Sequence, residues 1–113
     1  MLSIEQFRYG NDNFAYLVHG KKQAMAIDGG AWETILSFLK ANQLALIFVT
    51  NTHDHYDHTS GNEFLLKNTA AEFLKASNFP DHHEMMIDGE VIRVFRTPGH
   101  TNDSVCFYTG HSL

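Results

Sequence analysis

The stretch from Gln23 to Val49 constrains the fold most, because it carries two strand patterns separated by one helix pattern. Gln23 to Asp28 predicts a strand, which Gly29-Gly30 ends. Apolar side chains then recur at helical spacing and predict a helix that runs to about Asn42: Trp32, Ile35, Leu36 and Leu39. Leu44 to Val49 is a continuous apolar run, short enough for a strand buried on both faces. Strand, helix and strand in this order predict a βαβ unit, and hence a partly parallel sheet in an α/β fold.

Further strand patterns flank this unit. Apolar residues indicate strands at residues 2–7, 14–18, 91–95 and 104–109. Phe64-Leu65-Leu66 predicts a short helix and Asp88-Gly89 a hairpin turn, whereas Ala70 to Ala76 fits strand or helix equally well. The 113 residues hold no repeat or linker, so residues 1–113 are expected to form a single domain. Gly110 to Leu113 resembles the middle of a hairpin, which predicts that the domain is truncated at its C-terminal end.

Charge and composition exclude several classes of protein. Eight Lys and Arg against 13 Asp and Glu give a net charge of −5, which argues against nucleic-acid binding. No apolar run of about 18 residues is present, so we expect no membrane span, and the first residues lack the pattern of a signal peptide. A single cysteine, Cys106, fits a reducing compartment, and a cytoplasmic location is therefore expected.

The segment His53-Asp54-His55-Tyr56-Asp57-His58 follows directly after the buried strand that ends near Thr50. Three imidazoles and two carboxylates within these residues suit zinc, or iron or manganese in a related geometry. In extended backbone His53, His55 and Asp57 would point to one side and His58 elsewhere, which predicts two neighbouring metal positions. The carboxyl end of a strand is also where α/β sheets place their ligands. The alternative interpretation is a solvated polar loop whose histidines only form hydrogen bonds.

His100 is the second element of the predicted metal site. It lies in Thr97-Pro98-Gly99-His100-Thr101, a turn between two predicted strands. A third neutral imidazole from a distant loop is what a three-histidine catalytic zinc site requires, leaving one position for water. On its own, His100 would be interpreted as an ordinary loop histidine.

Other polar and sulfur-containing residues carry weaker predictions. Asp28 is either a partner that holds a ligand histidine in place or a turn residue, and Asp54 is expected to orient its neighbours rather than to bind metal. His82-His83-Glu84 is expected to lie on a solvated loop. Cys106 is expected to be a buried thiol, and Met85 and Met86 are expected to pack in the core.

Three segments together resemble the metallo-β-lactamase superfamily: His53-x-His55-x-Asp57-His58, Ala26-Ile27-Asp28-Gly29-Gly30, and Thr97-Pro98-Gly99-His100-Thr101. Within it, Asp12-Asn13-Phe14-Ala15-Tyr16 and Ser104-Val105-Cys106-Phe107-Tyr108 look most like the glyoxalase II, or hydroxyacylglutathione hydrolase, branch. The resemblance extends along nearly the whole chain, which corresponds to about the first half of that family's catalytic domain. It implies half of an αββα sandwich, a mixed sheet with flanking helices.

The resemblance also assigns roles to the predicted ligands. His53, His55 and His100 would bind the first metal, Asp57 and His58 would contribute to the second, and Asp57 is the predicted catalytic residue. The cofactor would be one or two zinc ions. The family's bridging aspartate and its last histidine ligand would lie beyond Leu113, so weak or absent activity is expected of this chain alone.

The implied function is a metal-dependent hydrolase in which hydroxide attacks a small-molecule thioester. A glutathione thioester as substrate rests on the resemblance alone. Two alternatives stay open. One is an iron-dependent persulfide dioxygenase or oxygen-reductase-like protein. The other is a non-catalytic metal-binding half-domain that forms a homo-oligomer through its exposed sheet edge.

Overall fold

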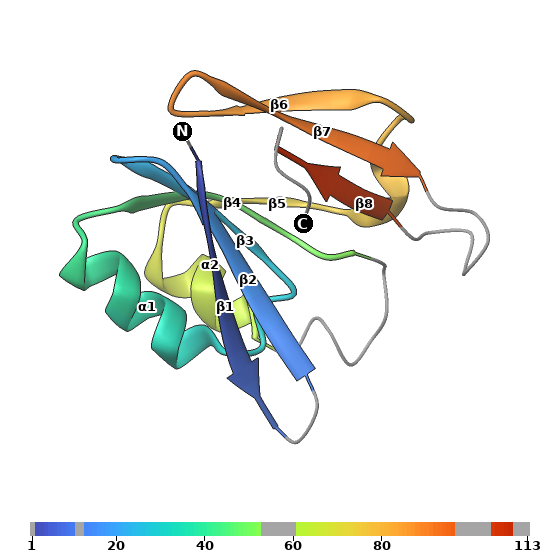
Figure 1. Cartoon of the computed structure of the whole chain (residues 1–113). Coiled ribbons are helices and arrows are strands. Elements are labelled where there is room, and N and C mark those ends of the chain that lie inside the picture. The colour runs from blue at the N-terminus through green and yellow to red at the C-terminus, as the bar shows by residue number, and fades with distance from the viewer. Residues whose placement is uncertain (1, 11–12, 53–60, 97–104, 110–113) are drawn as a thin grey trace.

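A computed structural model of the chain describes residues 2–10, 13–52, 61–96 and 105–109 (Figure 1). In chain order the elements are β1 (Ser3–Tyr9), β2 (Asn13–His19), β3 (Gln23–Ile27), α1 (Trp32–Ala41), β4 (Ala45–Thr50), α2 (Asn62–Asn68), β5 (Glu72–Leu74), a 3-10 helix (Ala76–Asn78), β6 (His83–Ile87), β7 (Glu90–Arg96) and β8 (Val105–Tyr108). The strands form two sheets. Both α-helices lie on the face of the larger sheet that points away from the smaller sheet.

The larger sheet has five strands in the order β1-β2-β3-β4-β5. β1, β2 and β3 pair antiparallel, whereas β3, β4 and β5 pair parallel. Helix α1 makes the crossover from β3 to β4, which confirms the predicted βαβ unit. The register pairs Ile27 with Thr50, so the carboxyl ends of β3 and β4 finish side by side. The residues that follow these two strands are therefore brought to the same edge of the sheet.

The helices cover one face of the five-stranded sheet, and β3 has small side chains on this face. β3 presents Ala24 and Ala26 to this face, and both are fully buried. Ile35 and Leu39 of α1 and Leu65 of α2 pack into the same cluster. Alanines leave room for a helix backbone to approach the sheet closely, and the larger aliphatic side chains of the helices fill the remaining space.

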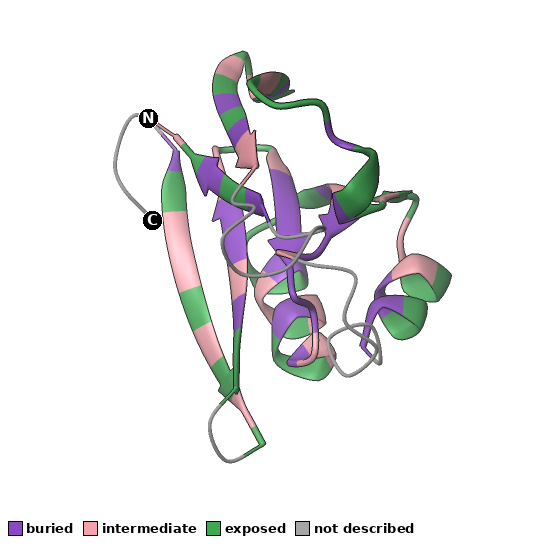
Figure 2. Cartoon of the chain, turned by 90° about the vertical axis from the view of Figure 1, so that its right-hand side faces the viewer, coloured by how far each residue is buried: buried purple, intermediate pink, exposed green. Residues whose placement is uncertain are grey.

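The second face of the larger sheet packs on a three-stranded antiparallel sheet of order β6-β7-β8. Here β3 contributes its larger side chains, Met25 and Ile27, and the small sheet contributes buried residues from all three of its strands. Those buried residues are Met85, Ile87, Ile92, Val94, Val105 and Phe107. The result is a helix layer and two sheet layers in sequence (Figures 1 and 2). The fold class is mixed α/β, as predicted.

The segment from Ala70 to Ala76, which the sequence left open, contains the short strand β5. β5 pairs with β4 over Phe48 to Thr50, and the 3-10 helix follows it directly. Three residues are too few for a periodicity to separate strand from helix. Tertiary pairing with β4 decides the outcome.

Three sequence-based expectations are wrong, and strand phase explains two of them. Cys106 is exposed, because Val105 and Phe107 on either side of it point into the core. Met86 is 51% exposed, whereas its neighbour Met85 is buried as expected. His83 and Glu84 do not lie on a loop but begin β6, where Glu84 pairs across the sheet with Arg93. Successive strand residues face opposite sides, and a run of apolar residues does not reveal which side is inside.

The two sheets are joined at one end by the turn between β6 and β7. The Asp88 carboxylate accepts hydrogen bonds from the backbone N–H groups of Lys22 and Gln23, at 2.9 and 3.0 Å. The Gln23 amide oxygen in turn accepts the N–H of Asp88 at 2.8 Å.

In the described part of the chain, no helix is long and apolar enough to cross a membrane.

Candidate metal centre

The predicted metal ligands fall in two segments that the structure leaves undescribed. His53, Asp54, His55, Asp57 and His58 lie in residues 53–60, and His100 lies in residues 97–104. The residues on either side of both segments are described. These flanking residues establish which parts of the fold carry the donors.

Thr52, the residue before His53, is held by the carboxylate of Asp28. The backbone N–H of Thr52 donates to Asp28 Oδ1 at 3.0 Å, and the Thr52 hydroxyl donates to Oδ2 at 2.9 Å. Asp28 is buried, and its own N–H donates to the Thr50 carbonyl at 2.9 Å. Its backbone has φ 55°, a left-handed conformation that aspartate tolerates better than most residues. Asp28 therefore fixes the start of the donor-bearing segment 53–60, and its side chain is engaged with the chain just before the predicted ligands.

The second donor-bearing segment ends at the same place. Val105 follows residues 97–104, and its N–H donates to the carbonyl oxygen of Thr52 at 2.7 Å. This bond joins the end of β4 to the start of β8, which belong to different sheets. His53 directly follows Thr52, which accepts this bond. Val105, which donates it, directly follows the segment 97–104 that contains His100. The residue before one of these segments, Thr52, therefore contacts the residue after the other, Val105.

The other end of segment 53–60 is held against the turn that follows β3. Gly61 packs so closely on this turn that a Cβ at position 61 would overlap the carbonyl oxygen of Gly29. Asn62, the first residue of α2, donates from Nδ2 to Oδ1 of Asn51 at 3.2 Å. Asn51 and Asn62 are both buried. The turn after β3 consequently contacts the chain on both sides of segment 53–60.

Tyr9 of β1 lies over the same turn. A Cβ at Gly30 would overlap the Tyr9 ring, so the aromatic ring packs directly on the Gly30 backbone. Burial raises the pKa of the Tyr9 phenol, and the negative charge of Asp28 raises this pKa further. The phenol is therefore neutral at physiological pH and does not supply an anionic ligand.

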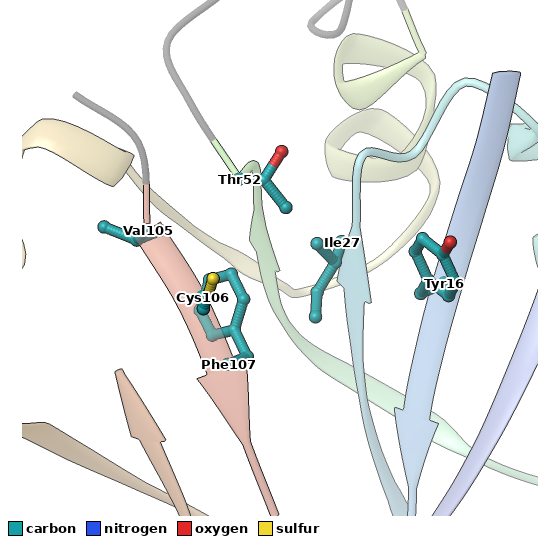
Figure 3. A pocket seen from close by; sticks show the side chains of 6 residues that line it. All are labelled: Tyr16, Ile27, Thr52, Val105, Cys106 and Phe107. Atoms are coloured by element: carbon teal, nitrogen blue, oxygen red, sulfur yellow. The ribbon is translucent and has the colours of Figure 1, made fainter. Parts of the chain in front are cut away.

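A cavity of about 230 Å³ lies beside Thr52, between the two sheets. Tyr16 and Ile27 line it from the larger sheet, and Thr52 lies at the end of β4 (Figure 3). On the opposite side it is lined by Val105, Cys106 and Phe107 of β8. The lining is mainly apolar. Its volume falls below the range of about 300–1,000 Å³ for sites that bury a drug-sized ligand.

Among the described residues there is no group of three or more His, Cys, Asp or Glu side chains that could hold a metal ion. His82, from the second histidine-rich stretch, is exposed and contacts Asp81 at 3.5 Å. The ring of His83 packs on Phe79 instead.

The donor set itself fits a divalent transition metal. The two segments outside the described residues, 53–60 and 97–104, carry four imidazoles and three carboxylates: His53, His55, His58, His100, Asp54, Asp57 and Asp103. Imidazole nitrogen and carboxylate oxygen are the ligands that zinc, iron and manganese accept in proteins. The residues present are therefore suited to the group predicted from the sequence.

Residue-level reasoning from the sequence missed the polar residues that frame these segments. Thr52, Asn51 and Asn62 were not singled out, and Gly61 was not recognised as a contact glycine. Their position next to the predicted ligands was the available signal. A polar side chain at the end of a buried strand needs a partner, and Asp28 at the end of the neighbouring strand supplies it for Thr52.

The chain is thus a layered α/β protein with a histidine-rich segment directly after β4. Comparison with known proteins identifies the class: the model of the metallo-beta-lactamase superfamily matches residues 8–85. The chain belongs to this superfamily, whose members hold metal ions.

Three relatives within this superfamily illustrate what the chain is similar to. A hydroxyacylglutathione hydrolase of Hydrogenovibrio crunogenus is 28% identical over 91% of this chain and 44% of its own length. A hydroxyacylglutathione hydrolase of Pseudoalteromonas translucida is 30% identical over 100% of this chain and 51% of its own length. The crystal structure of ETHE1 from Myxococcus xanthus matches with a TM-score of 0.84 and 26% identity, over 96% of this chain and 54% of that chain. The chain thus spans about half the length of the relatives it matches.

Proposed function

We propose that the protein is a metal-dependent hydrolase of the hydroxyacylglutathione hydrolase type, which cleaves a small-molecule thioester. The observation that carries this proposal is the backbone hydrogen bond from Val105 to Thr52. The bond joins the residue before segment 53–60 to the residue after segment 97–104, and these two segments hold the proposed histidine ligands. Relatives named hydroxyacylglutathione hydrolase that match along almost the whole chain support the choice of reaction.

His53, His55 and His100 would hold a first metal ion, and Asp57 and His58 would contribute to a second. Zinc is the proposed metal, because three histidines and one open position form a common catalytic zinc site. When bound, such an ion supplies a water molecule of lowered pKa and polarises the carbonyl group under attack. A thioester suits this chemistry, because its thiolate leaves without a strong general acid.

The remaining residues of the edge position the reacting groups. Asp28 holds Thr52, and Thr52 holds Val105, so the two donor-bearing segments start and end at fixed points. The cavity beside Thr52 has the size and lining for a short acyl group. We assign the acyl part of the substrate to this mainly apolar cavity. The cavity is too small for a whole glutathione thioester.

The test is hydrolysis of a hydroxyacyl-glutathione thioester by the whole protein and by two histidine variants. His55→Ala removes a proposed ligand and is expected to lower the rate at least about a hundredfold, since loss of a residue that only orients a metal ligand already costs about 10–100-fold. His82→Asn is the matched control, because His82 is an exposed histidine whose left-handed backbone, φ 62°, asparagine also accepts. Equal rates for the two variants would refute the proposed site.

Metal analysis of the same preparations separates the hydrolase from the redox alternative. Zinc in the wild type supports the hydrolase. Iron in the wild type, with no thioester turnover, would replace it by an iron-dependent persulfide dioxygenase or oxygen-reductase-like function.

A further inference from the structure

The cavity beside Thr52 has walls that belong to the core of the molecule. Ile27 of β3 lines it from the larger sheet, and Val105 and Phe107 of β8 line it from the smaller sheet (Figure 3). The relative exposure of these three residues is 2%, 3% and 4%. The space between them is therefore bounded largely by side chains that also pack the two sheets together.

Neighbouring elements hold these walls in place. Ile27 lies between two strands, opposite Tyr16 of β2 and Thr50 of β4 in the register of the sheet. The Phe107 ring packs edge-on against the buried ring of Phe79, with ring centroids 5.9 Å apart and ring planes at 88°. Close-packed side chains of this kind yield little to an added group, so the cavity has a definite size limit.

The volume and the lining of the cavity define the chemical group that it accepts. The volume is about 230 Å³, and the lining is mainly apolar. An apolar cavity of about 150 Å³ holds benzene. A flexible chain fills a cavity less evenly than a flat ring does, so we expect room for an aliphatic chain of about four to six carbon atoms.

Thr52 relates this cavity to the proposed reaction. It is one of the lining residues, and it directly precedes His53, a proposed ligand of the first metal ion. The Thr52 hydroxyl donates its proton to Asp28 Oδ2 at 2.9 Å. The cavity is thus lined by the residue next to segment 53–60, and the hydroxyl proton of that residue is already engaged.

We propose that this cavity selects substrates by their acyl chain, with Ile27 and Phe107 as the specificity-determining residues. The accepted class is a thioester of a straight-chain aliphatic acid of about four to six carbon atoms. Longer chains meet the buried side chains of Ile27 and Phe107, and a polar chain end loses its hydration on entering a mainly apolar space. The inference rests on the proposed function, because it names the acyl group of the same thioester.

The first experiment measures binding to the metal-free protein by NMR titration, so that it does not depend on turnover. The probes are S-methyl-, S-butyl-, S-hexyl- and S-octylglutathione, which carry the chain on a thioether that has no thioester bond to hydrolyse. Each added methylene is expected to strengthen binding about fourfold up to the size limit, and not beyond it. A terminal hydroxyl on the butyl chain should weaken binding about fivefold or more. The largest shift changes should fall on Ile27, Val105 and Phe107.

Substitutions at Ile27 move the size limit in opposite directions. Ile27→Ala enlarges the cavity and is expected to let S-octylglutathione bind more tightly than S-hexylglutathione. Ile27→Phe extends a larger side chain into the cavity and should lower the affinity for S-hexylglutathione to about that for S-methylglutathione. Ile92→Ala is the matched control, because Ile92 is fully buried in the same core cluster but does not line the cavity. It should lower the melting temperature and leave the order of the probes unchanged.

Ile27→Val covers the case in which Ile27→Ala does not fold. It removes a single carbon atom from the same wall and is expected to raise the affinity for S-octylglutathione relative to S-hexylglutathione by a smaller factor. Wild-type probe order in folded Ile27→Val and Ile27→Phe proteins would overturn the inference.

The second experiment compares kcat/KM of the metal-loaded wild type for acetyl-, butyryl-, hexanoyl- and octanoyl-glutathione. The values should rise to butyryl or hexanoyl and fall for octanoyl. Thioester turnover with equal binding of all probes, or with shift changes centred away from the cavity, would overturn the inference and leave the proposed function standing. Chain-length-dependent binding without turnover of any thioester would overturn the proposed function, and with it the assignment of the chain to a substrate.

Discussion

At the scale of single residues, Thr52 joins three parts of the fold through three different groups. Its N–H and hydroxyl donate to Asp28, and its carbonyl accepts the N–H of Val105. Asp28 follows one strand, Thr52 follows the neighbouring parallel strand, and Val105 begins a strand of the other sheet. Thr52, the residue before His53, is therefore hydrogen-bonded to both sheets, although it is not itself a proposed metal ligand.

Thr52→Val tests this role, because valine keeps the shape of threonine and loses the hydroxyl. The variant leaves Asp28 Oδ2 without the donor it has at 2.9 Å, and hydrogen bonds to charged groups contribute about 1.5–3 kcal/mol. We expect a loss of that order in the free energy of unfolding, measured by urea denaturation of the metal-free protein. Thr52→Ser retains the hydroxyl and should lose much less. Equal midpoints for the two variants would show that the hydroxyl has no such role.

Asp88 gives the fold a dependence on acid pH. Hydrogen bonds from the N–H groups of Lys22 and then Gln23 hold the pKa of its carboxyl below the ordinary value. A carboxyl whose pKa is lowered on folding adds stability above its unfolded pKa, near about 4, and loses this contribution as the pH falls through its lowered native value. Asp88→Asn retains the left-handed backbone, φ 50°, but has no charge to lose.

The expected result is a higher melting temperature for the wild type than for Asp88→Asn at pH 7, with a difference that shrinks as the pH falls below about 4. Thermal melts followed by circular dichroism between about pH 7 and pH 2 measure it. A difference that stays constant across this range would mean that the charge of Asp88 does not contribute.

At the scale of elements, Leu65 is the fully buried apolar side chain by which α2 packs on the sheet. The helix runs only from Asn62 to Asn68, and isolated helices of this length are not stable in water. Leu65 is fully buried against the backbone of Gly29, where an added Cβ would come within 2.5 Å of its Cδ1. Packing, rather than helix propensity, therefore keeps the start of α2 beside Asn51.

Leu65→Ala is expected to lower the free energy of unfolding by about 2–5 kcal/mol, because it leaves a cavity under α2. Lys67→Ala, an exposed position on the same helix, should change it by less than about 0.5 kcal/mol. Urea denaturation of both variants makes the comparison. Similar losses for the two positions would contradict the proposed packing.

The elements were predictable from sequence where their pattern was long and internally consistent. The helix at Trp32 to Asn42 and the strand at Leu44 to Val49 agree with α1 and β4 to within one residue at each end. Sequence patterns did not predict which side of a strand faces the core. In β8 all the residues are apolar or aromatic, so the sequence did not reveal that Cys106 faces outward. In the segment 70–76, pairing with β4 decided the structure.

At the scale of the whole molecule, the described chain has helices on one of its outer faces only. The outer face of the three-stranded sheet exposes apolar side chains, among them Met86, Val91 and Tyr108. β8 is also an edge strand of that sheet among the described residues. Unpaired strand edges with apolar neighbours favour pairing with another chain.

We expect the 113-residue chain to self-associate through this edge and to be a dimer or larger at micromolar concentration, as measured by light scattering. Tyr108→Lys places a charge on β8 and should shift the protein toward monomer, since charged side chains protect sheet edges. Glu72→Lys, on the short strand at the edge of the other sheet, is the control and should leave the mass unchanged. A wild-type protein that is monomeric and folds cooperatively would contradict this expectation.

The candidate site was only partly predictable because metal ligands and the residues that position them leave different traces in a sequence. Imidazoles and carboxylates gathered at short spacing are typical of metal sites and uncommon elsewhere, so His53, His55 and His100 could be proposed from the sequence. Buried amides and contact glycines such as Asn62 and Gly61 are common residues with many uses. Their role becomes visible only when the fold places Gly29 and Asn51 against them.

The central claim is that segments 53–60 and 97–104 together provide the ligands of a metal site, and metal content per chain tests it most directly. Elemental analysis of protein purified without chelator should find about one or two zinc ions per chain. The His55→Ala and His100→Ala variants should each lose most of this metal, and His82→Asn should retain it. A wild type without bound metal, or histidine variants that hold as much metal as the wild type, would contradict the account.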